Sequence, residues 1–195
     1  MIDYHKTNDE DLMNLFQKGD NFAFDELVKR YKQPLANFVY RFTSNYDDSL
    51  DIVQDTFVKV FNYKDHYQNV AKFSTWLYTI ASNLAKTSIR RKKRFKLFSS
   101  NLFKNKDEDL EIEYPDNDIK PDENTDNKLR AELIQKALSK IALHYREVVI
   151  LRDIMELSYD EISEITKLPK GTVKSRINRG RLYLKEYLIK FSKDF

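Results

Sequence analysis

The chain has 195 residues, of which 33% are charged and 41% hydrophobic, and a net charge of +3. A chain of this length forms one domain or two small ones, and only three glycines and four prolines disfavour a β-rich fold with many tight turns. Because there is no cysteine, a disulfide framework and a cysteine-ligated metal site are excluded, which favours an intracellular protein. No stretch resembles a signal peptide or the roughly 20 apolar residues of a membrane span, so we expect a cytoplasmic location.

The first part of the chain predicts three helices. A short helical pattern covers Asp9 to Phe16, and apolar residues recur at helical spacing from Ala23 to Thr43 and from Asp47 to Phe61. Pro34 lies inside the second pattern, so we expect that segment either to kink or to divide into two shorter helices.

The third of these helices carries a row of carboxylates, Asp47, Asp51 and Asp55, at i, i+4 spacing. Like charges on one face destabilise an isolated helix, which leaves three interpretations: a solvated face, a surface for a basic partner protein, or a site for a divalent metal. The residues alone favour the solvated face. They favour the metal least, because no histidine or further acid is placed nearby.

The stretch from Phe73 to Arg94 predicts a fourth helix, with Ser74 able to cap it and a strongly basic tail. From Lys86 to Lys96 there are seven basic residues and no acidic one. Aromatic residues followed by a basic run are typical of a surface for single-stranded nucleic acid, because rings stack on bases and cations meet phosphates. The alternative is that Trp76 and the neighbouring rings belong to the core.

An acidic segment follows. Between Asp107 and Asp126 there are ten acidic residues, one basic residue and two prolines. Such a composition buries too little apolar surface to order itself, so we predict a flexible linker over residues 97–127. It would separate an N-terminal domain, residues 1–96, from a C-terminal domain, residues 128–195, and the predicted fold class is all-α with two small helical domains.

The C-terminal part predicts a helix-turn-helix. Helices from Leu129 to Ala142 and from Tyr145 to Met155 should form its hydrophobic bed. A capping box then starts a helix at Ser158, the pair Leu168-Pro169 ends it, and a second helix should run from about residue 171 to 187. Seven basic residues and no acidic one lie between residues 167 and 185. Such a second helix fits the DNA major groove, the alternative being a solvated basic face.

The three histidines, His5, His66 and His144, are isolated in the sequence. No partner lies at metal-ligand spacing, so we interpret them as ordinary surface or packing residues and expect no metal site.

Three motifs, in this order, resemble a known family. VQDTF (53–57), FSTWLYTIASN (73–83), and YREVVILRDIMELSYDEISEI (145–165) running into LPKGTVKSRINRGR (168–181) are similar to conserved regions 2 and 4 of the extracytoplasmic-function group of bacterial sigma factors. The resemblance implies two helical domains that bind core RNA polymerase and direct it to promoter DNA, with no enzymatic activity and no cofactor. It raises the partner-protein interpretation of the carboxylate row above the solvated one.

The resemblance also implies site residues. The clamp helices of the largest polymerase subunit would be bound by Asp51, Gln54, Asp55 and Phe57, and the flap of the second largest subunit is a further contact. The −10 element would be melted and read by Phe73, Trp76, Asn83, Lys86, Arg90 and Arg91, with an unstacked base captured beside Asn83. The −35 element would be read by Thr172, Lys174, Ser175, Arg176, Asn178 and Arg179. A glycine is usual at the turn position of Lys167, so this lysine should adopt a left-handed conformation.

An anti-sigma factor, which would keep the protein inactive and hold it at the membrane, is a further partner typical of the family. Two rival functions come from other classes. One is a DNA-binding activator or repressor that uses only the helix-turn-helix, and the other is a magnesium-dependent nuclease built on Asp47, Asp51 and Asp55.

Overall fold

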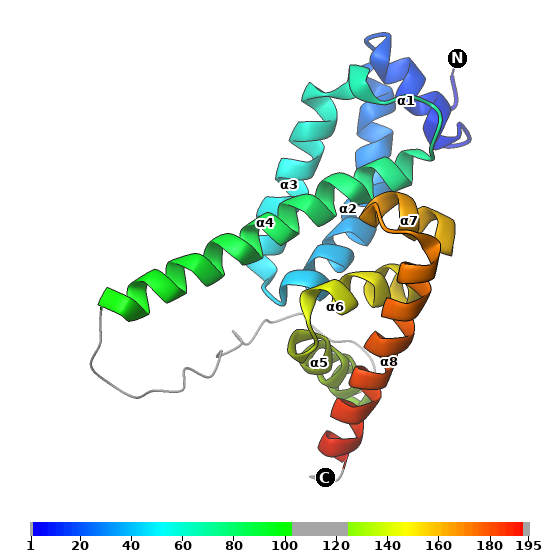
Figure 1. Ribbon diagram of the computed structural model, residues 1–195. Coiled ribbons are helices and arrows are strands. Elements are labelled where there is room, and N and C mark those ends of the chain that lie inside the picture. Colours follow the sequence, from blue (N-terminus) through cyan, green and yellow to red (C-terminus); the bar gives the residue numbers. More distant parts are fainter. Residues whose placement is uncertain (1, 103–124, 193–195) are drawn as a thin grey trace.

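The computed structural model describes residues 2–102 and 125–192, and every regular element within these ranges is a helix (Figure 1). The N-terminal body (residues 2–102) contains α1 (Asp9–Gln17), α2 (Asn21–Thr43), α3 (Tyr46–Asn62), the 3₁₀ turn η1 (Lys64–His66) and α4 (Phe73–Leu102). The C-terminal body (residues 125–192) contains α5 (Thr125–Lys140), α6 (Leu143–Val149), the π-helical turn η2 (Ile150–Ile154), α7 (Tyr159–Thr166) and α8 (Lys170–Ser192). The all-α prediction is confirmed.

Short polar side chains start the first three helices. Asn8, Asp20 and Asn45 precede α1, α2 and α3, and each accepts a hydrogen bond from a backbone N–H of the first turn. These bonds satisfy donors that have no partner inside the helix. Pro34 does not divide α2, which continues through it to Thr43, so of the two expected outcomes the break is wrong.

The core of the N-terminal body consists largely of aromatic and branched side chains. Fully buried positions include Phe16 on α1, Phe38 on α2, Val60 on α3 and Phe73 at the start of α4. The rings of Phe16 and Phe24 stack with centroids 4.7 Å apart. Four helices therefore converge on one core, which leaves one side of α3 and one side of α4 facing outward.

The C-terminal body is built around α6 and α7, with α8 packed across them. Val148, Ile162, Val173 and Ile177 are all fully buried. Gly180 lets α8 approach α6 closely, because a Cβ placed there would lie 2.5 Å from Cγ2 of Val149. Helix α8, the second helix of the predicted helix-turn-helix, thus packs on the apolar side chains of the preceding helices, as predicted.

A π-helical turn ends the helix predicted over residues 145–155. The amide of Met155 donates to the carbonyl of Ile150 at 3.0 Å, a bond that skips five residues instead of four. Such turns insert one extra residue into a helix. The sequence pattern gave no sign of it, because the apolar residues Ile150, Leu151 and Ile154 continue the helical pattern through the turn.

The helices on either side extend into the predicted linker. Helix α4 runs to Leu102 and α5 begins at Thr125, so residues 97–102 and 125–127 are helical instead of linker. The rest of the predicted flexible linker, residues 103–124, lies outside the described residues.

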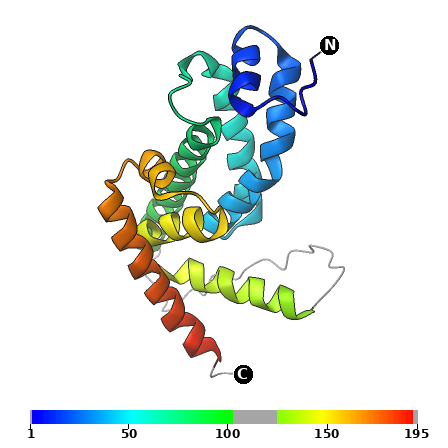
Figure 2. The same ribbon diagram turned by 90° about the vertical axis from the view of Figure 1, so that its right-hand side faces the viewer.

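The two bodies are in contact, which the sequence did not predict. Helix α7 packs on α4, and α5, α6 and η2 pack on α2. Figures 1 and 2 show the C-terminal body lying against the N-terminal one, and in Figure 1 α4 passes α7 and extends beyond both bodies.

Candidate functional site

Helix α3 presents a mixed acidic and apolar surface. Of the predicted polymerase-binding residues, Asp51, Gln54 and Asp55 are exposed, and none of the three makes a side-chain hydrogen bond or ion pair within the described residues. Large apolar side chains lie beside them: Leu50 is 43% exposed and Phe61 is 47% exposed. Exposed apolar side chains among carboxylates are typical of a protein-binding surface.

Phe57, the fourth residue predicted for this surface, lies elsewhere. It is only 9% exposed, and its ring packs edge-on against Phe24 with centroids 6.4 Å apart. Its side chain therefore anchors α3 to the core instead of facing outward. Among the described residues, no group of three His, Cys, Asp or Glu side chains is arranged to hold a metal ion.

A pocket of about 360 Å³ opens on the outward side of α4. It brings together two predicted −10 residues, Trp76 and Asn83, with Thr87 one turn further along the helix. Asn83 is exposed, and its side-chain amide makes no hydrogen bond within the described part of the chain. The pocket thus combines an aromatic face with an amide free to donate and accept.

Three further residues that line the pocket were missed by sequence reasoning. Lys59 and Tyr63 come from the end of α3, and His66 comes from η1. The rings of Tyr63 and His66 meet edge to face, with centroids 5.5 Å apart. Neither has a periodic signal that would place it beside Asn83, because only the fold of the segment between α3 and α4 brings them there.

The other predicted −10 residues divide into buried and exposed groups. Phe73 is fully buried and packs against Tyr31 and Tyr67, so the core interpretation holds for this ring. Arg90 and Arg91 are exposed. Lys86 is paired with Glu147 of the C-terminal body, with Nζ 2.9 Å from Oε1.

The helix-turn-helix begins with the predicted capping box. The hydroxyl of Ser158 accepts from the amide of Glu161 at 3.3 Å, and the Glu161 carboxylate accepts from the Ser158 amide at 2.8 Å. Burial alone would raise the pKa of Glu161, but hydrogen bonds from Lys72 and Ser158 outweigh it and lower the pKa to about 2. The turn residue Lys167 has a φ of 57°, in the left-handed region as expected.

The outer face of α8 carries the predicted −35 residues. Four of them are exposed: Lys174, Ser175, Asn178 and Arg179. Thr172 and Arg176 are half-buried.

Two other cations of α8 are already in ion pairs with carboxylates of the C-terminal body. Lys170 pairs with Asp160 of α7, and Arg181 makes two hydrogen bonds to Asp153. These pairs fix the two ends of the exposed segment, and the exposed cations between them, Lys174 and Arg179, have no ion pair within the described residues.

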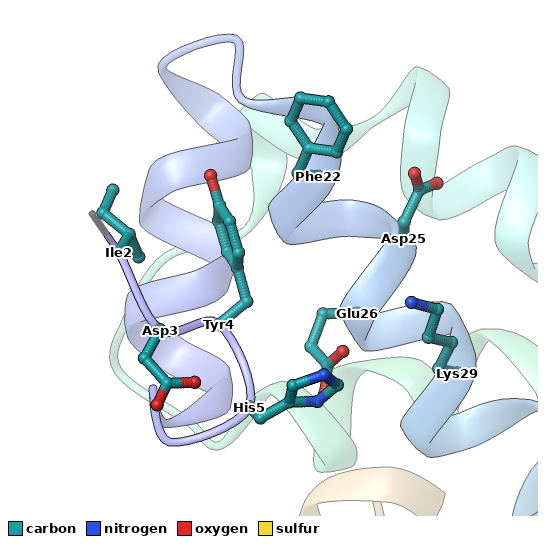
Figure 3. A pocket seen from close by; sticks show the side chains of 8 residues that line it. All are labelled: Ile2, Asp3, Tyr4, His5, Phe22, Asp25, Glu26 and Lys29. Atoms are coloured by element: carbon teal, nitrogen blue, oxygen red, sulfur yellow. The ribbon is translucent and has the colours of Figure 1, made fainter.

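A second, larger pocket lies at the far end of the N-terminal body. Its volume is about 460 Å³, and it lies between the first residues of the chain and α2 (Figure 3). Its carboxylate Glu26 is paired with His5 and Arg30. None of the predicted site residues lines it.

Within the residues described, none of the helices has the length and apolar character needed to cross a bilayer.

Comparisons with known proteins agree with the geometry. Residues 27–95 match the family Sigma-70 region 2, and residues 131–184 match Sigma-70, region 4. The chain is 34% identical over 172 residues to the ECF RNA polymerase sigma factor SigW of Bacillus subtilis, covering 88% of this chain and 92% of that protein. It is 36% identical over 183 residues to the ECF RNA polymerase sigma factor SigE of Mycolicibacterium smegmatis, covering 90% of this chain and 66% of that protein.

A solved structure has the same fold. The sigma factor RpoE of Bartonella quintana, determined in complex with the anti-sigma factor NepR, superposes with a TM-score of 0.65 at 26% identity, covering 85% of this chain and 96% of that one. The chain therefore belongs to the extracytoplasmic-function group of sigma factors, which direct bacterial RNA polymerase to promoters and are not enzymes.

Proposed function

We propose that three surfaces divide the work of promoter recognition in this chain: α3 binds the clamp helices of core polymerase, the α4 pocket takes a base of the −10 element, and α8 reads the −35 element. The observation that carries the proposal is the pocket beside Asn83. It lies on a helix, Phe73–Leu102, that contains no acidic residue, so its surroundings attract a nucleic acid strand.

The chemistry of the pocket suits an unstacked base. Trp76 and Tyr63 offer ring faces for stacking, which is worth about 1–3 kcal/mol per base and tolerates any sequence. Asn83 adds an amide that can pair with a base edge, and Thr87 adds a hydroxyl. Stacking would thus offset the cost of extracting the base, which is a few kcal/mol, and the polar groups would supply selectivity.

Helix α8 suits the major groove of duplex DNA. Lys174 and Arg179 are exposed and carry no ion pair in the described structure. The side chains of Asn178 and Arg179 are of the types that make bidentate hydrogen bonds to the edges of adenine and guanine, respectively. The half-buried Arg176 and Thr172 lie at the border of this face, where phosphate contacts would position the helix.

Docking on core polymerase would use Asp51, Gln54 and Asp55 with the apolar side chains around them. Three outward polar groups and the exposed apolar side chains of Leu50 and Phe61 offer both charge complementarity and buried area. Phe57 would contribute indirectly by fixing α3. We further propose an anti-sigma factor as a regulatory partner, because the similar RpoE of Bartonella quintana was solved bound to one.

Run-off transcription with purified core enzyme on a promoter library tests the proposal. Asn83→Ala should lower transcript yield by about fivefold to 150-fold, the equivalent of about 1–3 kcal/mol of lost base contacts, and binding to a −35 duplex should not change. Asn37→Ala is the matched control, since Asn37 is exposed on α2 and lines neither pocket. Equal activity of the Asn83 variant and the control on every promoter would refute base capture in this pocket.

A further inference from the structure

The pocket between the first residues of the chain and α2 has no part in the proposed function. Its volume of about 460 Å³ is within the range of small-molecule sites, about 300–1,000 Å³. Figure 3 shows its two walls, one formed by residues 2–5 and the other by the first turns of α2. A ligand held there would therefore contact two segments that only the fold brings together.

The charge of the pocket favours a cation. Three carboxylates line it, on Asp3, Asp25 and Glu26, together with a single lysine, Lys29. Asp25 is exposed, and its side chain makes no hydrogen bond or ion pair within the described residues. The carboxylates do not converge on one point, since the described part of the chain contains no group of three such side chains that could hold a metal ion. The pocket therefore suits an organic cation, which is larger than a metal ion.

Glu26 is the most buried of the three carboxylates, with a side chain only 8% exposed. A single oxygen, Oε1, lies 3.0 Å from Nδ1 of His5 and accepts from Nε of Arg30 at 3.2 Å. Burial alone would raise the pKa of Glu26, but the hydrogen bonds to Arg30 and His5 outweigh it and lower the pKa, so this carboxylate is ionised at neutral pH. The other oxygen, Oε2, has no hydrogen-bond partner among the described residues, which leaves it able to accept from a ligand in the pocket.

Two aromatic rings, those of Tyr4 and Phe22, line the same pocket. Their centroids are 6.4 Å apart and their planes are tilted by 42°. Phe22 is 71% exposed, so one face of its ring is open to a ligand. The face of an aromatic ring attracts cations because its π-electrons carry partial negative charge. Open rings beside ionised carboxylates thus offer an organic cation both stacking and charge neutralisation.

We propose that this pocket binds a guanidinium group, carried either by a free small molecule or by an arginine side chain of a polypeptide. A guanidinium is planar, so it stacks on an aromatic ring while its N–H groups donate to carboxylates. An alkylammonium has the same charge but cannot stack in this way, and it should bind more weakly. The inference does not depend on the proposed function, because none of the residues assigned to polymerase or promoter binding lines the pocket.

Titration of the full chain with Nα-acetyl-arginine amide, followed by NMR, tests the proposal. We expect saturable binding with a Kd on the order of 1 mM, with shifts of the backbone amides of Tyr4, Phe22 and Asp25. The indole signal of Trp76, which lines the other pocket, should not move. Nα-acetyl-citrulline amide has the same shape without the charge and should bind about 10-fold more weakly or less well still. Equal binding of the citrulline compound, or shifts confined to other parts of the chain, would overturn the proposal.

Substitutions in the pocket give the second measurement. Phe22→Ala should weaken binding of Nα-acetyl-arginine amide by about 2-fold to 30-fold, and Glu26→Gln should weaken it by about 10-fold or more. Because Phe22 is exposed, its variant should keep the melting temperature of the unmodified protein, which guards against simple loss of folding. The matched charge control is Asp65→Asn, since Asp65 is exposed and lines neither pocket. Unchanged affinity of the Phe22 variant, or equal weakening by Asp65→Asn and Glu26→Gln, would overturn the proposal.

Two further probes separate the two sources of the guanidinium. Butylguanidine represents a free small molecule, and acetyl-Gly-Arg-Gly amide represents an arginine within a chain. Ile2 is 49% exposed beside the pocket, so backbone on either side of a bound arginine would cover it. Tighter binding of the tripeptide supports a polypeptide source, and binding of butylguanidine that is at least as tight supports a small molecule. Failure of every guanidinium probe to bind would refute the proposal even where the chain transcribes normally with core polymerase, whereas absence of transcription would refute the proposed function instead.

Discussion

Replacing Gly180 with alanine tests how closely α8 is packed on α6. An added Cβ would lie 2.5 Å from Cγ2 of Val149 and 3.4 Å from both Cβ and the carbonyl oxygen of Tyr145. Ordinary carbon–carbon contacts are about 3.5–4.0 Å. Either α8 or the Val149 side chain must therefore move by about 1 Å.

Two opposing terms set the expected change in the free energy of unfolding. Overpacking of a close contact costs about 1–3 kcal/mol. Alanine instead of glycine inside a helix gains about 0.8–1.0 kcal/mol. The sum is a destabilisation of about 0–2 kcal/mol, which we expect to lower the melting temperature by up to several degrees in a chain of this size.

Gly171→Ala is the matched control on the same helix. A Cβ at that position meets nothing within 4 Å, so only the helix-propensity gain remains and the variant should be as stable as the original or up to about 1 kcal/mol more stable. Urea unfolding followed by circular dichroism measures both variants. The decisive observation is whether Gly180→Ala has a lower free energy of unfolding than Gly171→Ala.

A second variant identifies the clashing group. Val149→Ala removes the methyl group that the new Cβ would meet, so in a double-mutant cycle the two substitutions should couple favourably by about 0.5–3 kcal/mol. If Gly180→Ala stabilises the protein as much as Gly171→Ala does, or if the cycle shows no coupling, α8 packs less closely on Val149 than the 2.5 Å separation implies.

Three further outcomes follow from the surfaces. Asp55→Arg should abolish binding to core polymerase in gel filtration while the circular dichroism spectrum stays unchanged, because it reverses an exposed charge on α3. Arg179→Ala should weaken −35 duplex binding by about 1–3 kcal/mol if it contacts a base. Since the pKa of Glu161 is lowered to about 2, its stabilising contribution should be complete above about pH 5 and disappear as the pH falls toward 2. Ser158→Ala should therefore lower the free energy of unfolding by about 1 kcal/mol at neutral pH and by less in acid.

Each of these outcomes has a control or a contrary result. Asp65→Arg reverses an exposed charge in η1 and should leave polymerase binding intact, and normal binding by the Asp55 variant would contradict the docking surface. For Arg179→Ala, an equal loss of affinity on every DNA sequence would indicate a phosphate contact instead of a base contact. The slope of log affinity against log salt concentration would then be smaller by about one. A stability difference between Ser158→Ala and the unmodified protein that stays constant from neutral to acid pH would contradict the Glu161 assignment.

Local signals in the sequence predicted local structure well. The capping box at Ser158 and Glu161, and the left-handed turn at Lys167, depend on residues within a few positions of one another, and both are confirmed. Helical periodicity likewise located α3, but two of the apolar residues in that pattern are not buried, since Leu50 and Phe61 are 43% and 47% exposed. A periodic pattern gives the apolar side of a helix and not how much of it the neighbours cover.

Contacts between distant residues could not be predicted. Ser82 and Glu147 are 65 positions apart, and a single polar pair leaves no periodic trace in one sequence. His66 looks isolated along the chain, yet the fold places it in the pocket with Asn83. Most of the residues that the resemblance assigns to binding surfaces are exposed, but the resemblance could not tell that Phe57 and Phe73 are buried.

The wide turn at Ile150–Ile154 sets where the connection to α7 begins, because the amides of Met155 and Leu157 donate to the carbonyls of Ile150 and Leu151, each at 3.0 Å. Deleting a single residue there would break these bonds and shift the start of α7 relative to α6. The number of residues in this stretch, more than their identity, is therefore what natural variation should preserve.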